Sequence, residues 1–454
     1  MPNIELTEIK ALAKPLLRLG GPLIVNNLAI AGMQFADAVM AGSLGARELA
    51  AVAVGGSFWF LGFSLCLGIL MAISPIVARH FGAGNFDLIG RYTRQGIYLS
   101  FVLGIPVMLI GQFATAPLLE SFGIDPEFRD LSVGYVGAIT LGAPGIFIFL
   151  SLRFTTEGIG FIRPIMFTSI FALVCNVFLN YVLMFGHFGA PALGAIGCGY
   201  ASAISMWIVM LTLLSYMMIS RHYHRFHIFS RLAPMRLGVL REIVSLGIPI
   251  AITITAEAGL FSAVSILMGT RGTLITAGHQ IAISFSSTTF MIPLALSGAT
   301  TVVVGQLMGA GKYREARLSG WIGVLMCGGF MMISAAFLLV FRGAVVGLYT
   351  ADPAVTGIAI SLLLMAAVFQ VVDGIQIGSA GALRAYKDTK IPMVINIFAF
   401  WVLAFPLAYL AAITYRAPPN TIWAGFIVGL GVAAILLTWR YHKISSRPLE
   451  LQPV

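Results

Sequence analysis

The chain has 454 residues, of which 59% are hydrophobic and 10% are charged, and its mean hydropathy is +0.96. Soluble domains hold about 25% charged residues, so this composition excludes a soluble enzyme or binding domain and indicates a membrane protein. The net charge of +10 does not indicate nucleic-acid binding, because the positive residues follow the loops between apolar segments.

Apolar segments of spanning length recur along the whole chain. A bilayer-spanning helix needs about 20 mainly apolar residues. Twelve such segments are centred near residues 27, 63, 107, 142, 174, 205, 255, 290, 330, 367, 402 and 429. We therefore predict an all-α polytopic membrane protein with twelve transmembrane helices and almost no chain left for a soluble domain.

The positive residues predict the orientation of these spans. Alternate loops hold every Lys and Arg residue of the chain except Arg47, Arg129, Arg271, Arg342 and Arg416. Because cytoplasmic loops carry an excess of Lys and Arg, both termini are predicted to be cytoplasmic. No cleavable signal peptide is expected, because the first apolar segment is long enough to span the membrane.

The second half of the chain repeats the first at a shift of 227 residues. The shift pairs Gly20 with Gly247, and it also pairs the loop sequences Gly82-Ala83-Gly84 with Gly309-Ala310-Gly311 and Asp125-Pro126 with Asp352-Pro353. Two homologous six-helix lobes are therefore expected, residues 1–218 and residues 242–454. We expect a pseudo-two-fold axis along the membrane normal between them, with substrate bound at their interface near mid-membrane.

Residues 219–241 form the predicted cytoplasmic linker, which is rich in Arg and His. Its His222, His224 and His227 have no Cys or carboxylate nearby, so we expect contact with lipid headgroups rather than a metal site. The cysteines fall within predicted spans at no metal-ligand spacing and are predicted to be small packing residues: Cys66, Cys175, Cys198 and Cys327.

Three acidic residues, Asp37, Glu257 and Asp373, stand inside predicted spans, and Asp373 is the only charged residue in 353–383. A charge at the bilayer centre costs at least about 2.5 to 3.5 kcal/mol. No Lys or Arg is expected deep in a span to pair with these acids. Such an acid persists by being protonated, by binding a cation or by facing water. These options favour an ion-coupled transporter over a purely structural ion pair.

Polar side chains share helix faces with these acids. Gln370 and Gln376 lie three residues on either side of Asp373, Gln34 lies three before Asp37, and Thr253 lies four before Glu257. In the fifth span, Asn176 and Asn180 form a polar pair that suits either a site or an interhelical hydrogen bond. The acids themselves are not duplicated, because the 227-residue shift places apolar residues opposite them: Val264, Ile30 and Ile146.

Several motifs resemble the multidrug and toxic compound extrusion (MATE) family: AGHQIAISFSSTTFMIPLALSGA (277–299), VGQLMGAGK (304–312), PIVARHFGAGN (75–85) and ALRAYKDTKIPM (382–393). The acids occur in QFADAVMAG, TAEAGLF and VVDGIQ, the three positions of the NorM-type bacterial branch. The resemblance covers the whole chain and implies the MATE fold of two six-helix lobes. It also implies export of organic cations and amphipathic drugs, hence antibiotic resistance, by antiport against Na⁺ or H⁺ with alternating access in the bacterial inner membrane.

The resemblance also assigns site residues. It assigns the second-lobe coupling-cation site to Glu257 and Asp373, and helical spacing adds Gln370, Gln376 and Thr253 as candidate neighbours. It assigns the first-lobe cation, proton and substrate site to Asp37, Asn176 and Asn180, and helical spacing adds Gln34 as a candidate neighbour. Drugs and membrane lipids are the implied partners, and no cofactor, obligate protein partner or metal other than Na⁺ is implied. Phe369 stands where we expect that branch to hold a tyrosine, so the choice between Na⁺ and H⁺ stays open.

Two other transport functions compete with this one. A flippase for lipid-linked or other amphipathic substrates on a related fold would favour a cationic cleft for phosphates, whereas the predicted intramembrane charges are acids. A major facilitator would carry a basic loop motif that RHFGAGNFDLIGRYTR does not resemble. An enzyme is not expected, because the sequence has no nucleophile-base-acid arrangement, metal-ligand spacing or phosphate-binding loop.

Overall fold

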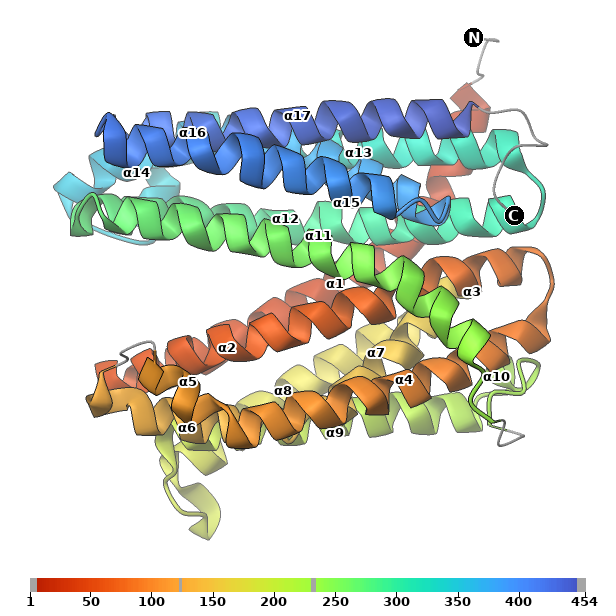
Figure 1. The fold of residues 1–454 in the computed structure, drawn as a ribbon, viewed down its shortest axis with the longest axis horizontal. Helices are drawn as coiled ribbons and strands as arrows, with labels where there is room; N and C mark the ends of the chain where they lie inside the picture. The colour runs from red at the N-terminus through yellow and green to blue at the C-terminus, as the bar shows by residue number, and fades with distance from the viewer. Residues whose placement is uncertain (1–5, 122–124, 230–233, 447–454) are drawn as a thin grey trace. The chain divides into compact units, whose positions relative to one another are not determined.

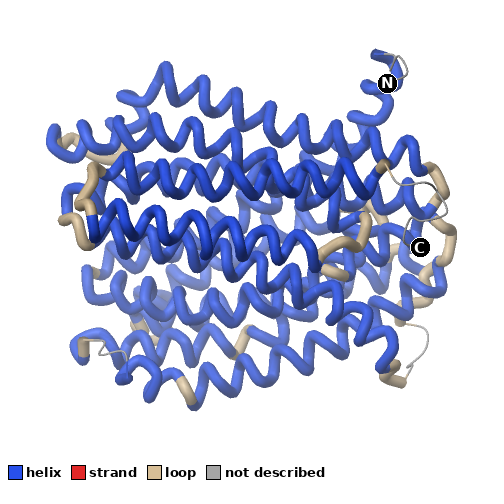
Figure 2. The backbone as a smooth tube through the Cα atoms, turned by 45° about the horizontal axis from the view of Figure 1, so that its top comes forward, coloured by secondary structure: helices blue, strands red, loops and turns tan. Residues whose placement is uncertain are grey.

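The computed structural model describes residues 6–121, 125–229 and 234–446, and helices make up nearly all of them (Figures 1 and 2). No β-strand occurs in these three segments. The fold class predicted from composition is therefore confirmed. Residues 230–233 of the predicted linker, with Arg231, lie outside the described residues, as do residues 447–454.

The number of spans also agrees with the prediction. Within the described part of the chain, eleven helices are long and apolar enough to cross a bilayer alone. The helices α6 (Pro126–Thr140) and α7 (Ala143–Gly158) are bent by 46° at the break between them, and the number of spans is twelve when this pair counts as one. Pro144 lies in the first turn of α7, where proline is well tolerated at a helix start but not inside one. This bend therefore has a local sequence cause.

The chain divides into two compact units. The N-unit is Val25–Ala251, and the C-unit comprises Met1–Ile24 and Ile252–Val454. These limits fall inside α1 (Leu6–Leu44) and α11 (Leu237–Gly269), each of which contributes to both units. The limits of the predicted lobes, residues 1–218 and 242–454, were placed in loops instead. These lobes stay a prediction.

The N-unit is organised around α9 (Gly194–Ile219), which packs against α6, α7 and α8 (Arg163–Phe185). Gly199 permits the close approach of α9 to α6, because a Cβ at that position would lie 2.7 Å from the carbonyl oxygen of Tyr135. The remaining elements of this unit are α2 (Ala46–Met71), α3 (Ile73–Gly82), α4 (Phe86–Phe113), α5 (Thr115–Ser121), η1 (His187–Gly189) and α10 (Arg221–His224).

The C-unit is organised around α14 (Pro353–Ala385), which packs against α12 (Thr273–Gly309), α13 (Tyr313–Gly347) and α17 (Pro419–Ser445) (Figure 1). The other span of this unit combines α15 (Lys390–Ile397), η2 (Phe398–Ala404), α16 (Phe405–Tyr409) and η3 (Leu410–Thr414). Unlike α6 and α7 at the corresponding place in the repeat, α14 is continuous. The central helix of the C-unit is thus the one that carries Asp373.

Equivalent loops of the two units have the same backbone geometry, in agreement with the internal repeat. Gly84 and Gly311 end equivalent helices with φ of +72° and +74°, a region that favours glycine. Asp125 and Asp352 each cap a helix by accepting a hydrogen bond at 2.9 Å from the backbone N–H two residues later. Loops with the same sequence signals therefore fold the same way 227 residues apart.

Gly374 is expected to be required for the packing of α14 against α13. A Cβ at Gly374 would lie 2.7 Å from Met331 Cγ and 2.8 Å from the carbonyl oxygen of Cys327, whereas one at Gly357 on the same helix would meet no described atom within 4 Å. We expect Gly374→Ala to destabilise the protein by about 1–3 kcal/mol through overpacking. Gly357→Ala should be neutral or stabilising by about 0.4–1 kcal/mol. Thermal unfolding of the two purified variants measures the difference, and equal melting temperatures would contradict it.

Candidate functional site

The acid of α14 is buried inside the C-unit. Asp373 is 3% exposed, and its Oδ1 accepts no hydrogen bond from any described residue. The predicted polar stripe surrounds it: Gln376 is buried, and Gln370 is buried and accepts a hydrogen bond at 2.8 Å from Ser334 of α13. A buried carboxylate oxygen without a hydrogen-bond donor is costly, so this position is suited to a cation or a proton.

Glu257 of α11 lies near this carboxylate. It is half-buried and is close enough to Asp373 for a repulsive electrostatic interaction. Thr253, one turn earlier on the same helix, is also half-buried. The structure thus brings the two predicted acids of the C-unit together, while their role as a coupling-cation site stays a prediction.

Phe369 belongs to an aromatic cluster rather than to the polar stripe. Its ring centroid lies 5.0 Å from that of Phe426, 5.7 Å from that of Trp423 and 5.9 Å from that of Phe261. The indole Nε1–H of Trp423 donates to Nδ1 of His279 at 3.2 Å. A tyrosine hydroxyl at position 369 would need a polar partner among these rings. The phenylalanine is therefore explained by local packing.

Arg153 and Arg384, which were predicted to lie in loops, lie inside the helices α7 and α14. Arg384, in the last turn of α14, is 8% exposed and donates from Nη2 to Ser297 Oγ of α12 at 2.8 Å. It also interacts favourably with Glu257. Helical side chains point toward the N-terminus of their helix. A basic residue in the last turn of a helix can therefore carry its charge back into the unit.

In the N-unit, Asp37 of α1 joins side chains from α8 and α9. Its carboxylate accepts from Asn180 Nδ2 at 2.5 Å and from Ser202 Oγ at 3.3 Å. Asn180 Nδ2 also lies 3.3 Å from Asn176 Oδ1, and the Cys198 thiol is within hydrogen-bonding reach of Asp37. The described partners of this carboxylate are all neutral, so they orient it without cancelling its charge.

The predicted N-unit residues are only partly brought together. Asn176 and Asn180 join Asp37, but Gln34 is exposed and makes no hydrogen bond to Asp37 within the described residues. Sequence reasoning missed Ser202, although a serine in an apolar helix is a usable signal. It also interpreted Cys198 only as a packing residue, whereas the structure places this buried thiol beside the acid.

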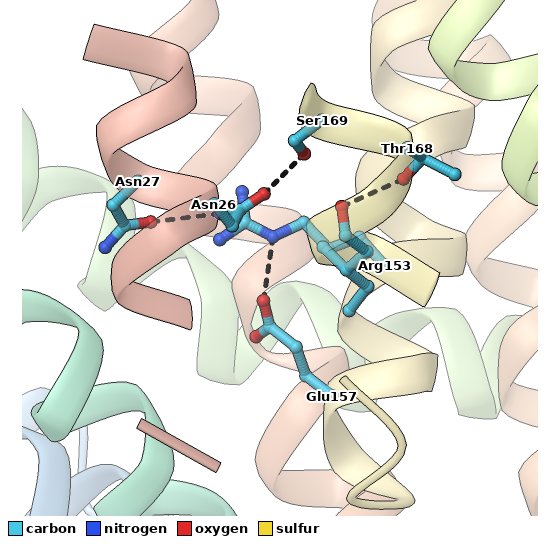
Figure 3. Close-up of polar contacts among 7 residues, drawn as sticks. Asn26, Asn27, Arg153, Glu157, Thr168 and Ser169 are labelled. Carbon is cyan, nitrogen blue, oxygen red and sulfur yellow. Dashed lines mark hydrogen bonds and ion pairs between the residues drawn. The ribbon is translucent and has the colours of Figure 1, made fainter. Parts of the chain in front are cut away.

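A second polar cluster in the N-unit was not predicted (Figure 3). Arg153 Nε donates to Glu157 Oε1 at 2.7 Å within α7, and these side chains are 12% and 6% exposed. The Asn26 amide of α1 lies 2.6 Å from Ser169 Oγ of α8. When its nitrogen faces Ser169, its oxygen accepts from Arg153 Nη2 at 3.1 Å. This cluster links three helices, and its ion pair adds no net charge to the N-unit.

Comparisons with known proteins agree with this architecture. The MatE family model matches residues 22–182 and 249–410, two segments that begin 227 residues apart. The chain is 37% identical over 444 residues to "Multidrug resistance protein PmpM" of Pseudomonas aeruginosa, covering 97% of this chain and 93% of that protein. It is 36% identical over 443 residues to "Multidrug resistance protein MdtK" of Photorhabdus laumondii, covering 97% of each.

Solved structures show the same fold at lower identity. The crystal structure of the eukaryotic MATE transporter AtDTX14 superposes with a TM-score of 0.89 at 22% identity over 98% of each chain. An outward-facing MATE family transporter of the MOP superfamily superposes with a TM-score of 0.87 at 20% identity, covering 95% of this chain and 96% of that one.

Proposed function

We propose, from the premise that the chain belongs to the MATE family, that it is a multidrug efflux transporter driven by antiport of Na⁺ or H⁺. Its substrates would be organic cations and other amphipathic drugs. Because its relatives are transporters, the chain is not an enzyme. The observation that carries the proposal is the buried carboxylate of Asp373, whose Oδ1 has no partner among the described residues and which has a second acid nearby.

In the C-unit, exchange follows from competition for Glu257 and Asp373. A cationic drug and a coupling cation both stabilise the ionised acids, so binding of one lowers the affinity for the other, and the coupling is reciprocal. In the outward-open state, Na⁺ or H⁺ entering the site down its gradient would then displace the drug to the outside. The oxygens of Gln376 and Gln370 would add neutral ligands beside the acids.

In the N-unit, Asp37 would hold a cation or a proton with help from α8 and α9. Asn180 and Ser202 fix the position of the carboxylate by donating to it, and Asn176 fixes Asn180 in turn. Gln34, which is exposed, would contact a bound drug rather than the acid itself. The charge of Asp37 thus remains available for a positively charged ligand.

The structure supports both coupling ions. Na⁺ is a hard cation that prefers oxygen ligands, and the carboxylates of Asp373 and Glu257 with the Gln376 oxygen would supply them. Phe369 has no hydroxyl to add to this set, and its ring is fully engaged in packing. A proton requires only the carboxylates.

The buried arginines do not favour the alternative function, export of lipid-linked or other phosphate-bearing amphipathic substrates. Such a transporter would need net positive charge to hold phosphates. Arg384 lies near Glu257, and Arg153 is paired with Glu157. Neither arginine gives its surroundings net positive charge, so drug export remains the better proposal.

We further propose that the protein lies in the bacterial inner membrane with both termini cytoplasmic. Its bacterial relatives and the apolar spans support this location, and the distribution of Lys and Arg between loops supports the orientation. Drugs and lipids would be its partners, with no obligate protein partner and no cofactor besides the coupling ion.

Ethidium efflux from proteoliposomes tests this function, with a Na⁺ gradient and a pH gradient imposed separately. We expect one of the two gradients to drive efflux well above the rate in protein-free liposomes. The gradient that succeeds identifies the coupling ion. If neither gradient changes the rate, the antiporter proposal is wrong.

A further inference from the structure

The charge of Arg384 lies well inside the C-unit. Its Nη2 donates to Ser297 Oγ at 2.8 Å, and the same hydroxyl donates to the carbonyl oxygen of Ile377 at 2.7 Å. This hydroxyl lies beside the turn of α14 between Ile377 and Gly381, which is on the Asp373 side of Arg384. The guanidinium therefore extends back along α14 toward the buried acid.

The packing of α12 against α14 fixes this position. A Cβ at Gly381 would lie 2.3 Å from Ser297 Oγ, so only glycine lets Ser297 approach α14 this closely. The hydroxyl that holds Arg384 is thus set by a tight helix contact.

Glu257 interacts electrostatically with two other charged side chains at this place. Glu257 repels Asp373 and attracts Arg384, and Arg384 also influences Cys327 of α13, which is neutral as a thiol. When both acids are ionised, the group carries two negative charges and one positive charge. A single monovalent cation therefore makes the group neutral.

We propose that Arg384 limits the C-unit site to one positive charge and thereby makes a coupling cation and a cationic drug mutually exclusive there. This inference rests on the proposed antiport function. Two buried acids without a base would remain negatively charged after binding one cation and would attract a second. A site that held both cations at once would not exchange one for the other. Arg384 is thus a positioning and specificity-determining residue of the C-unit.

Charge rescue tests this role through binding of tetraphenylphosphonium, a monovalent organic cation, to the purified protein. Glu257→Gln leaves the charges of Asp373 and Arg384, whose sum is zero, and should lower the affinity by about tenfold or more. Glu257→Gln combined with Arg384→Gln again leaves one net negative charge. We expect the double variant to bind within about threefold of wild type. A merely structural role for Arg384 would make the double variant worse than the single one.

Three further variants keep the test independent of any one substitution. Arg384→Lys preserves the charge and should bind like wild type. Ser297→Ala releases the guanidinium from its anchor and should raise the affinity for methyl viologen, a dication, relative to tetraphenylphosphonium. Thr301→Val, which removes the neighbouring bond between α12 and α14, is the matched control and should not change this ratio.

The results separate the inference from the function on which it rests. Suppose that wild type binds tetraphenylphosphonium while the double variant binds no better than Glu257→Gln. In that case the proposal that Arg384 limits the charge of the site is wrong, and the transport proposal stands. The inference also fails if Ser297→Ala and Thr301→Val change the dication ratio equally. If wild type shows neither binding nor gradient-driven efflux, both proposals are wrong.

Discussion

Asp373→Asn is expected to abolish ion-dependent drug efflux while the protein still folds and inserts. Asparagine has nearly the same shape, so α14 keeps its contacts with α12, α13 and α17. The substitution removes the negative charge that a proton or Na⁺ would neutralise, and Glu257 then faces only Arg384. Ethidium efflux from proteoliposomes under the driving gradient measures the loss, with protein incorporation measured in parallel.

Asp352→Asn is the matched control for this variant. Asp352 lies at the start of the same helix and accepts a hydrogen bond from the Ala354 N–H at 2.9 Å. Asparagine caps helices about as well as aspartate, so this variant should transport like wild type. If Asp373→Asn also transports normally, Asp373 is not part of the coupling site.

Arg153→Met should destabilise the N-unit strongly. It leaves Glu157 without its 2.7 Å partner at a position where the carboxylate side chain is 6% exposed. Breaking a buried ion pair by removing one partner costs about 3–5 kcal/mol. Unfolding of the purified protein in detergent, followed by near-ultraviolet circular dichroism, measures the change.

The second partner and a surface pair provide the controls. Replacing both members, as Arg153→Met with Glu157→Leu, should restore most of the stability, because no buried charge is left unpaired. Lys312 and Glu315 form an exposed pair at 3.5 Å, and Lys312→Met should cost less than about 1 kcal/mol. A cost for Arg153→Met as small as that for Lys312→Met would mean that Glu157 is solvated.

The sequence was sufficient to predict the spans and the repeat, because both depend on local signals. Runs of apolar residues determine where helices can cross a bilayer. The loops repeat because Gly84 and Gly311 supply the same positive φ and because Asp125 and Asp352 supply the same cap. Such signals act within a few residues, so they can be recognised without knowledge of the packing.

The candidate sites were less predictable, because they depend on the positions of the polar groups at the ends of side chains. Arg153 and Arg384 were assigned to loops from their positions near helix ends, yet their side chains carry the charge inward. Gln34 shares a broad face with Asp37, but a three-residue step rotates a side chain by about 60° around the helix. That rotation is enough to expose it. Ser202 contacts Asp37 only because α9 packs beside α1, which a pattern along one helix does not reveal.

The repeat has a consequence for how much loss of function the protein can tolerate. Its backbone plan exists in two copies, as Gly84 and Gly311 show, but each acid exists once, with Val264 and Ile146 at the positions equivalent to Asp37 and Asp373. The duplication therefore repeats the backbone fold but not the acidic side chains. Neither half holds a spare of the other's carboxylates, so the candidate site of the N-unit depends on Asp37 alone and that of the C-unit on Glu257 and Asp373.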